Sequence, residues 1–348
     1  MNLSDRVKSF EILGERLRRF HENAPGTDMS VLVEAARMAS HKNPWFTPEH
    51  IRIALNNLGH ALSAENLVHW LSHYDGRVDC VSAPRNIGVV MAGNIPAVGF
   101  HDFLCVLISG NKLTAKLSSS DDQLLPAMAT ILTDYLPEWH DFISFTSGKL
   151  DRFDAIIATG NSNTSRYFEF YFGRYPHIIR KNRNSIAVLD GNESLHDLQN
   201  LAADIMLYFG MGCRSISKIL VPAGYNFVRI IEALSRFDCF SNHNKYRNNY
   251  EYFKSIFMVG QVPFIDTGFM LLKEDPDNAS RIAVLHYEYY HKPEDLAGII
   301  LPGNDSVQCV ISNMTLPVKV LRFGEGQNPA LWDYADQVDT MEFLLSWV

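Results

Sequence analysis

The sequence predicts an α/β protein in which two domains, each with a largely parallel sheet covered by helices, are interleaved along the chain. Its 348 residues are enough for roughly two domains. From residue 86 onward, short apolar segments of strand type alternate with helical segments, as in parallel strands joined by right-handed crossovers. No internal repeat and no low-complexity linker is present. We therefore expect the domains to share the chain and not to be joined by a tether.

The first 75 residues are predicted to be helical. Thr47-Pro48-Glu49 combines a capping hydroxyl, a proline at the first helical position and an acid in the first turn. Ser63-Ala64-Glu65 is a second helix start, because apolar residues follow it at helical spacing. We expect these helices to brace a larger domain.

A strand, a helix and a second strand come next and form one β-α-β unit. Residues 87–91 are a short apolar run of the buried-strand type, followed by the turn Gly93-Asn94-Ile95-Pro96. Residues 97–108 are apolar and helix-like, Gly110 is a candidate C-terminal cap, and residues 112–117 are the second strand.

The alternation continues to residue 313. The predicted helices are residues 122–135, an aromatic-rich stretch after Thr159-Gly160-Asn161, and a long helix from Leu195 through Tyr208. The predicted strands are residues 142–145, 154–158, 185–189, 218–221, 268–272, 282–287, 298–301 and 307–311. We assign residues 1–195 and about 314–348 to one domain, and residues 196–313 to the other.

Charge and composition exclude several classes of protein. A net charge of −8 and a pI near 5.9 argue against a nucleic-acid-binding protein, because binding to phosphates requires a concentrated basic surface. Residues 1–20 carry charges throughout and lack the apolar core of a signal peptide, and no apolar run is long enough to span a membrane. We expect a soluble, cytoplasmic protein that binds no nucleic acid and has no integral membrane contact.

The five cysteines are odd in number, widely spaced and never arranged as Cys-x-x-Cys, which argues against a disulfide framework or a zinc site. They are Cys80, Cys105, Cys213, Cys239 and Cys309. Cys213 stands apart, because Gly210 and Gly212 allow a tight turn between a long helix and a strand. A thiolate there could accept a carbonyl carbon while backbone N–H groups stabilise the oxyanion. The alternative is a buried, inert cysteine near a helix end.

Polar residues also follow the predicted strands, at the edge where open α/β sheets bind ligands. Asn94 could donate a hydrogen bond to developing negative charge, although Asn in such a turn is often purely conformational. Lys116, Ser118 and Ser119 could contact ribose or phosphate, and the alternative is a solvated lysine before a serine-rich loop. Thr159-Gly160-Asn161 precedes a helix, whose N-terminal amides favour an anion.

Four of these groups occur together in a recognisable order. Gly93-Asn94-x-Pro96, Gly110-Asn111 with Lys116, the loop Thr159-Gly160-Asn161, and Gly210-Met211-Gly212-Cys213 are similar to the Trp-Asn-x-Pro, Gly-Asn-x-x-x-x-Lys, Phe-Thr-Gly-Ser and Gly-Gln-x-Cys elements of aldehyde dehydrogenases. A second family shares these elements and also matches four further stretches of this chain. They are Asn43-Pro44-Trp45-Phe46-Thr47, Cys213-Arg214-Ser215, Phe323-Gly324-x-Gly326-Gln327 and Asp333-Tyr334-Ala335-Asp336-x-x-Asp339-Thr340-Met341. With these, the chain more closely resembles the LuxC-like acyl-CoA reductases, the long-chain fatty-acyl reductase family.

This resemblance implies an aldehyde dehydrogenase-like fold, in which a Rossmann-type cofactor domain is interleaved with a smaller α/β catalytic domain. Residues 1–195 and about 314–348 would bind NADPH, and residues 196–313 would carry Cys213. The implied cofactor contacts are Lys116, Ser118, Ser119, Thr159, Gly160 and Asn161. Glu288 is loosely similar to the superfamily's nicotinamide-ribose glutamate, and the alternative is an ordinary strand residue.

Two departures from the aldehyde-oxidising members are informative. In those members a water-activating glutamate precedes a Ser-Pro-Asn-Ile-Val strand, to which Ser185–Asp190 is similar. Counting back from Ser185, this glutamate would fall near Ile178, within His177-Ile178-Ile179-Arg180, where no carboxylate stands. Reduction of a thioester needs no such water. The glutamate that binds the adenosine ribose in NAD-dependent members is replaced by Ser119, which leaves room for a 2′-phosphate and favours NADPH.

The resemblance implies NADPH-dependent reduction of an acyl thioester to the aldehyde through an S-acyl intermediate on Cys213, with Asn94 and a backbone N–H holding the oxyanion. The implied substrate is an acyl-CoA of fatty-acyl type or an acyl-carrier thioester. Arg214 could keep the thiol ionised or lie at the surface. A homo-oligomer and acyl-transfer partner enzymes are expected by analogy. The alternatives are an NAD(P)-dependent aldehyde dehydrogenase, a reductase of acyl phosphates, or a catalytically silent scaffold of an acyl-transfer complex.

Overall fold

The computed structural model describes residues 1–21, 30–74, 76–79, 83–300 and 306–346. Contacts divide the chain into two compact units: unit 1 comprises Met1–Lys181 and Ala330–Val348, and unit 2 comprises Asn182–Pro329. Unit 1 is therefore assembled from two separate stretches of chain. Cys80, one of the five cysteines, lies outside the described residues.

Unit 1 contains a five-stranded parallel sheet with the order β3-β2-β1-β4-β5. The strands are β1 (Asn86–Val90), β2 (Lys112–Lys116), β3 (Ile143–Thr146), β4 (Ala155–Thr159) and β5 (His177–Arg180). Helix α5 (Phe100–Ile108) connects β1 to β2, α6 (Leu124–Tyr135) precedes β3, and α7 (Ser162–Phe172) connects β4 to β5. The chain moves outward from β1 to β3 and then returns to β4 on the other side of β1, so the strand order reverses between β1 and β4.

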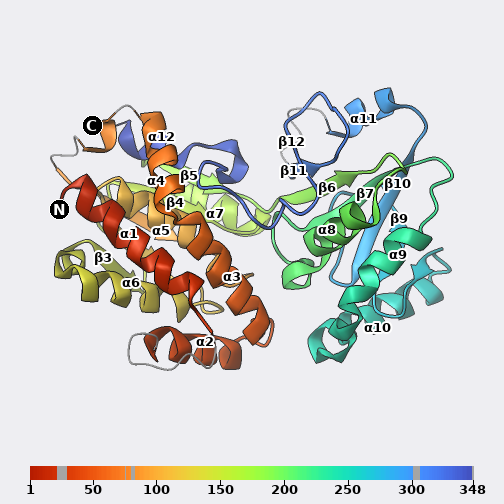
Figure 1. Cartoon of the computed structure of the whole chain (residues 1–348), viewed down its shortest axis with the longest axis horizontal. Coiled ribbons are helices and arrows are strands. Elements are labelled where there is room, and N and C mark those ends of the chain that lie inside the picture. The colour runs from red at the N-terminus through yellow and green to blue at the C-terminus, as the bar shows by residue number, and fades with distance from the viewer. Residues whose placement is uncertain (22–29, 75, 80–82, 301–305, 347–348) are drawn as a thin grey trace. The chain divides into compact units, whose positions relative to one another are not determined.

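The N-terminal helices pack on this sheet unit. They are α1 (Leu3–Arg18), α2 (Ser30–Lys42), α3 (Pro48–Ala61) and α4 (Ala64–Leu71), and α12 (Thr340–Leu345) joins them from the far end of the chain. The two predicted helix starts are confirmed, because Thr47 accepts from His50 N–H and Ser63 accepts from Asn66 N–H. Helix α1 packs along α3 and also contacts α5 and α6 (Figure 1), so it braces the helices that cover the sheet.

Two elements of unit 1 differ from the sequence prediction. Helix α5 begins at Phe100 and not at residue 97, because Ala97 has a φ of 55° and belongs to a turn. Strand β5 forms where no strand was predicted. It pairs with β4 at the edge of the sheet, where Ile178 is buried while His177 is exposed.

Unit 2 contains a seven-stranded sheet with the order β12-β11-β6-β7-β10-β9-β8, parallel throughout except for the β8–β9 pair. The strands are β6 (Asn184–Val188), β7 (Ile216–Pro222), β8 (Ile265–Asp266), β9 (Leu271–Glu274), β10 (Val284–Tyr290), β11 (Val307–Ile311) and β12 (Val320–Leu321). The helices are α8 (Leu195–Met206), α9 (Val228–Leu234), α10 (Asn244–Val259) and α11 (Pro293–Ile300). Helix α8 packs against both β7 and α9 (Figure 1).

Short 3-10 helices complete both units. They are η2 (Ser72–Tyr74), η3 (Arg77–Asp79), η4 (Pro137–Asp141), η5 (Leu207–Gly210), η6 (Ser235–Asn242) and η7 (Ala335–Gln337). Helix α8 is shorter than predicted, because the chain turns into η5 after Met206, two residues before Tyr208.

The predicted strand at residues 298–301 is wrong. Residues 298–300 form the last turn of α11, and residue 301 lies outside the described residues. Pro293 at the helix start and the acids Glu294 and Asp295 in the first turn are helix-start signals that outweigh the short apolar run at the end of the helix.

The unit boundaries also differ from the expected limits of 195 and about 314. The chain enters unit 2 after Lys181 and leaves it after Pro329. The physical reason is strand pairing, because β6 pairs with β7 and β11, and β12 pairs with β11, all within the sheet of unit 2.

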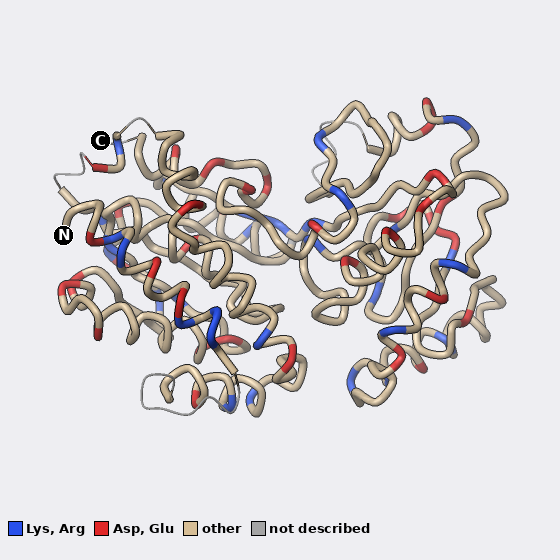
Figure 2. Tube along the Cα trace, in the orientation of Figure 1, with Lys and Arg blue, Asp and Glu red and all other residues tan. Residues whose placement is uncertain are grey.

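Lys and Arg are interspersed with Asp and Glu along both units (Figure 2). Several of these side chains pair at exposed positions, such as Arg37 with Glu34 and Arg77 with Glu342. Among the described residues, no helix combines the length and the apolar character needed to cross a membrane.

An almost fully buried ion pair joins the sheet of unit 1 to α5. Arg180 Nη1 of β5 lies 2.6 Å from Asp102 Oδ2, and Arg180 Nη2 donates to Thr340 Oγ1 at 2.9 Å. We predict that Asp102→Ala lowers the free energy of unfolding by about 3–5 kcal/mol, because it leaves a buried guanidinium without its counter-ion. Urea unfolding followed by tryptophan fluorescence measures this loss.

Lys181→Met is the matched control, because the neighbouring Lys181–Glu169 pair is exposed and should contribute less than about 1 kcal/mol. Equal losses in the two variants would contradict the prediction. The double variant Asp102→Leu, Arg180→Met should recover much of the loss, since it removes both charges together.

Candidate functional site

Three neighbouring strands of unit 1 end at one edge of the sheet. Val90, the last residue of β1, pairs with Lys116 of β2 on one side and with Ala158 of β4 on the other. The segments at this edge carry all the site residues predicted for unit 1, namely Asn94, Lys116, Ser118, Ser119, Thr159, Gly160 and Asn161. The strand order reverses here, and open α/β sheets bind ligands at such a point.

The loop that carries Asn94 is fastened to the segment after β2. Met91 N–H donates to Lys116 O at 3.0 Å, and Ala97 N–H donates to Asp121 Oδ2 at 2.7 Å. A Cβ atom on Gly93 would lie 2.5 Å from the Oγ atom of Ser118, so only glycine permits this close approach. Asn94 itself is exposed.

Asp121 belongs to this site although the sequence did not single it out. The residue is only 4% exposed, and burial raises the pKa of its carboxyl group to about 7, against the opposing effect of the Ala97 N–H. In the sequence, Asp121 and Asp122 precede α6 and look like acids at a helix start. Only the fold distinguishes the buried one, which holds the Asn94 loop, from its neighbour.

The other groups at this edge are hydroxyls and one ammonium group. Lys116 and Ser118 are half-buried, and Ser119 is exposed. No carboxylate occurs between Lys116 and Asp121. The carboxylate of Asp122 forms an ion pair with Lys42 of α2. This donor set suits the hydroxyls and phosphates of a nucleotide.

The Asn161 side chain caps α7. Its Oδ1 atom accepts hydrogen bonds from the N–H groups of Asn163 at 3.0 Å and of Thr164 at 2.8 Å. The sequence predicted that the N-terminal amides of this helix would bind an anion. Two of these amides already donate to the capping side chain, and anion binding at this helix start stays a prediction.

Cys213 lies in unit 2, in the turn between η5 and β7, and it is exposed. The chain reaches it through Tyr208, Phe209 and Gly210, whose φ angles are 55°, 58° and 72°. Positive φ is strained for Tyr and Phe, and such strain is concentrated at functional sites. Packing offsets the strain, because the buried Phe209 ring contacts an aromatic cluster made of Phe240, His243 and Tyr246.

Hydrogen bonds define the turn that presents the Cys213 side chain. Ser215 N–H donates to Gly212 O at 3.0 Å, and Gly212 N–H donates to Ser215 Oγ at 3.2 Å. The Ser185 hydroxyl of β6 donates to the Cys213 carbonyl oxygen at 2.9 Å and lies 2.9 Å from the sulfur of Cys309. Burial raises the pKa of the Cys309 thiol to about 11, so this thiol stays protonated and donates to Ser185.

Arg214 follows the nucleophile candidate directly. It is half-buried, and its Nη1 atom has no hydrogen-bond partner among the described residues. Its positive charge lowers the pKa of Cys309, against the larger opposing effect of burial, so the guanidinium lies near that half-buried thiol. A role for Arg214 in ionising Cys213 stays a prediction.

Glu288 lies on β10, within the sheet of unit 2. Its Oε2 atom is 2.5 Å from Nζ of Lys218, a fully buried residue of β7 that also donates to Pro276 O at 2.6 Å. The Glu288 carboxylate therefore neutralises a buried charge inside the sheet. This contact matches the alternative reading of Glu288 as a strand residue, and its ribose contact stays a prediction.

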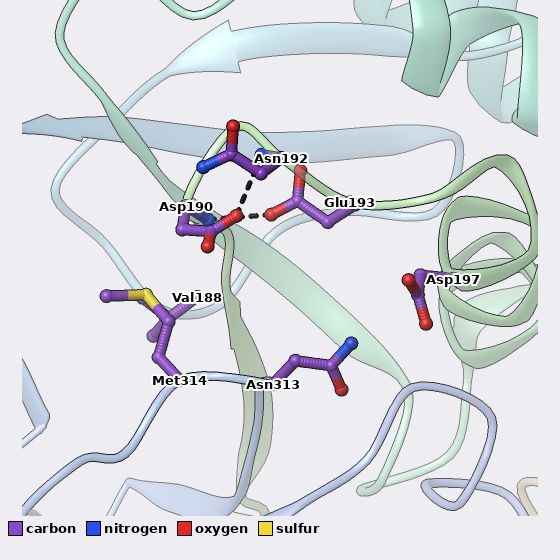
Figure 3. Close-up of a pocket in the computed structure, with 7 residues that line it drawn as sticks. All are labelled: Val188, Asp190, Asn192, Glu193, Asp197, Asn313 and Met314. Atoms are coloured by element: carbon purple, nitrogen blue, oxygen red, sulfur yellow. Dashed lines mark hydrogen bonds between the residues drawn. The ribbon is translucent and has the colours of Figure 1, made fainter.

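A pocket of about 90 Å³ lies at the Val188 end of β6 (Figure 3). Ser185, which holds the Cys213 turn, is near the other end of this strand. Glu193 Oε1 accepts from Asp190 N–H at 2.6 Å, which closes the loop above Val188. The lining residues are Val188, Asp190, Asn192, Glu193, Asp197, Asn313 and Met314, and none of them was predicted as a site residue.

The comparisons with known proteins concern both units. The sequence model of a family described as acyl-CoA reductase (LuxC) matches residues 45–235, which is more than half of the chain. This segment includes Asn94, Lys116 and Cys213. Among curated proteins, none matches the sequence significantly.

Solved structures of aldehyde dehydrogenases share the fold. The enzyme from Mycobacterium tuberculosis complexed with NAD+ has a TM-score of 0.61 and 16% identity over 92% of this chain and 76% of that one. Aldehyde dehydrogenase 21 from Physcomitrella patens, in complex with the reaction product succinate, has a TM-score of 0.62 and 12% identity over 95% and 79% of the two chains. The NAD+ complex from Bacillus cereus has a TM-score of 0.57 and 11% identity over 90% and 72%. The predicted aldehyde dehydrogenase-like α/β fold is confirmed.

The raised pKa of Asp121 predicts a pH dependence of stability. Between 3.8, its value in an unfolded chain, and about 7, Asp121 is protonated in the folded protein and ionised in the unfolded chain. The folded state then binds more protons, so this group makes the free energy of unfolding fall as the pH rises through that window. Asp121→Asn should flatten this fall and still accept the Ala97 N–H. Urea unfolding at several pH values between 4 and 7 tests it.

Asp122→Asn is the matched control, because the pKa of the Asp122 carboxyl group is shifted in the opposite direction. Partial burial is the largest single effect and raises the pKa of Asp122, but the hydrogen bonds from Lys42 and Gln123 together with the charge of Lys42 outweigh it, so the pKa lies below its ordinary value of 3.8. Its contribution to stability is lost only as the pH falls below about 3.8, so Asp122→Asn should leave the slope between pH 4 and 7 nearly unchanged. If the two variants changed the pH dependence in the same direction, the role assigned to Asp121 would be wrong.

Proposed function

The chain belongs to the acyl-CoA reductase (LuxC) family, and on this basis we propose that it reduces an acyl thioester to the aldehyde with NADPH, through an S-acyl intermediate on Cys213. The proposed substrate is a fatty acyl-CoA or an acyl group on a carrier protein. Unit 1 is proposed to bind the cofactor and unit 2 to carry the nucleophile. A cytoplasmic homo-oligomer with acyl-transfer enzymes as partners is proposed from the family resemblance alone.

The exposure of Cys213 carries this proposal. Two described cysteines lie within the segment that the family model matches. Cys105 is fully buried in α5, and burial raises the pKa of its thiol well above the ordinary value, which makes it inert. Cys213 is exposed in a turn between η5 and β7, where its thiol can meet a substrate, as a nucleophile requires.

The chain's own residues account for the transfer of the acyl group. The Cys213 sulfur attacks the thioester carbonyl carbon, and the bond to the CoA sulfur breaks as CoA leaves as a thiolate. The Cys213 N–H donates to the oxygen that becomes negative during the attack. The family resemblance assigns the exposed Asn94 amide as a second donor, and the hydrogen bonds at Gly93 and Ala97 support its loop.

The carboxyl edge of the unit 1 sheet fits a nicotinamide dinucleotide. The ammonium group of Lys116 and the hydroxyls of Ser118, Ser119 and Thr159 stand at the edge where the strand order reverses. When bound there, the cofactor supplies the hydride that converts the acyl group to the aldehyde. Ser119 stands at the position where NAD-dependent members have a glutamate, and this loss of a carboxylate supports NADPH over NADH, because a 2′-phosphate carries extra negative charge.

The same architecture could oxidise aldehydes, but β5 argues against it. The glutamate that activates water in oxidising members would fall near Ile178, which is buried in the strand, and its neighbours in β5 are His177, Ile179 and Arg180. Without that base, an acyl group on Cys213 is protected from hydrolysis and persists until hydride arrives.

We predict that Cys213 becomes acylated when the protein is mixed with acetyl-, octanoyl- or palmitoyl-CoA in the absence of a nicotinamide. Mass spectrometry of the intact protein and its peptides detects the adduct, and Cys213→Ser should abolish it. Cys239→Ser is the matched control, because Cys239 is exposed but lies outside the matched segment. An adduct on Cys239, or on no cysteine with any donor, would refute the proposal.

Ser119→Glu should reverse the cofactor preference. A carboxylate at this exposed position would repel a 2′-phosphate and could accept from a ribose 2′-hydroxyl, so kcat/KM with NADPH should fall about tenfold or more while that with NADH rises. Steady-state kinetics with both cofactors measure the change. Ser120→Glu at the adjacent exposed position is the control, and an equal effect there would indicate a general charge effect.

A further inference from the structure

The segment Phe323-Gly324-Glu325-Gly326-Gln327 lies near the C-terminal end of unit 2 and has no part in the steps above. It docks on the last turns of α8, at Asp204. Gly324 N–H donates to Asp204 Oδ2 at 2.6 Å. Gly324 has a φ of 92°, and a Cβ atom on Gly326 would lie 2.9 Å from Asp204 Oδ1 and 2.7 Å from Ile311. Both glycines are therefore required for the segment to approach α8 so closely.

Asp204 is almost completely buried, with an exposed fraction of 1%. Burial raises the pKa of its carboxyl group to about 6, while backbone N–H groups of Gly324, Gly326 and Gln327 lower it. Asp204 is thus a buried acceptor that fixes the position of the segment and, with it, of Gln327.

The Gln327 side chain then reaches the Cys213 turn. Its Nε2 atom donates to the backbone oxygen of Asp204 at 3.2 Å and to Ser215 Oγ at 3.3 Å. The Asp204 carbonyl lies in the last turn of α8, where carbonyl groups lack a partner within the helix. Ser215 Oγ in turn accepts from Gly212 N–H at 3.2 Å. Gln327 and Ser215 are 8% and 2% exposed, so these hydrogen bonds are shielded from water.

We propose that Gln327, set in place by Asp204, is a positioning residue that fixes the turn carrying Cys213 for acyl transfer. The inference rests on the proposed function, because it assigns Gln327 to the acylation step. Gln327 touches neither the thiol nor the acyl group. It links the end of α8 to Ser215, so that the peptide groups on both sides of Cys213 keep the orientation in which the Cys213 N–H meets the developing oxyanion.

The test compares Gln327→Met with wild type. Methionine has a similar length but donates no hydrogen bond, so both links are lost. The rate constant for acylation of Cys213 by octanoyl-CoA should fall about tenfold to hundredfold, because a small misplacement of an oxyanion donor costs this much. Alkylation of Cys213 by iodoacetamide should change little, because that reaction develops no charge on a carbonyl oxygen. Rapid-quench mass spectrometry follows both reactions.

Two further variants separate positioning from general structural damage. Asn328→Ala is the matched control, because Asn328 is the exposed next residue and its side chain donates to Gly324 O within its own loop. It should acylate like wild type. Gln327→Glu donates a hydrogen bond only when protonated, so its acylation rate, relative to wild type, should recover as the pH is lowered.

The proposal is overturned if Gln327→Met acylates like wild type, or if its acylation and alkylation rates fall together. If wild type is alkylated at Cys213 but never acylated by acetyl-, octanoyl- or palmitoyl-CoA, the proposed function is refuted, and the positioning role of Gln327 is decided by a separate measurement. Amide hydrogen exchange of the peptide covering residues 210–215 then decides the positioning role. Faster exchange in Gln327→Met than in Asn328→Ala supports it, and equal exchange refutes it.

Discussion

The hydrogen bonds around the Cys213 turn are the constraint on which the position of the candidate nucleophile in unit 2 depends. Ser185 of β6 binds the Cys213 carbonyl, and Gln327 binds Ser215 within the same turn. A strained chain reversal precedes the turn, with two buried aromatic residues at positive φ. The fold therefore holds one short stretch of backbone from several directions and leaves the Cys213 side chain exposed. Such an arrangement suits a group that must meet a substrate without reorganising.

In both units a buried carboxyl group holds a loop by accepting a backbone N–H. In unit 1 the buried carboxylate of Asp121 accepts the N–H of Ala97 and holds the Asn94 loop, and in unit 2 the buried Asp204 accepts the N–H of Gly324. Burial raises the pKa of both carboxyl groups, to about 7 and about 6. In each carboxylate Oδ2 accepts a backbone N–H, while Oδ1 is buried without a hydrogen-bond partner among the described residues. Losing the contact at Oδ2 would leave the whole group unsatisfied, so each carboxylate favours the loop conformation that supplies this N–H.

The described thiols differ in how far they are exposed. Burial raises the pKa of the thiols of Cys105 and of the half-buried Cys309, and the Cys309 sulfur lies within hydrogen-bond distance of Ser185 Oγ. Cys213 is exposed at the end of the segment that matches the acyl-CoA reductase family. The proposed reduction requires that the acyl-enzyme be kept from activated water, and Ile178, near which the water-activating glutamate of oxidising members would fall, is buried and apolar.

The sequence by itself determined features that depend on neighbouring residues or on the strand pattern. The capping of α3 and α4, the strand at residues 307–311, and the gathering of Asn94, Lys116 and Thr159 at one sheet edge follow from local signals and from the common direction of parallel strands. Only the tertiary structure decided which polar residues support the site. Gln327 and Ser215 are 112 positions apart, and Ser185 and Cys309 are 124 apart. Contacts over such distances leave no periodicity or spacing in the sequence, because chain topology and burial alone bring these residues together.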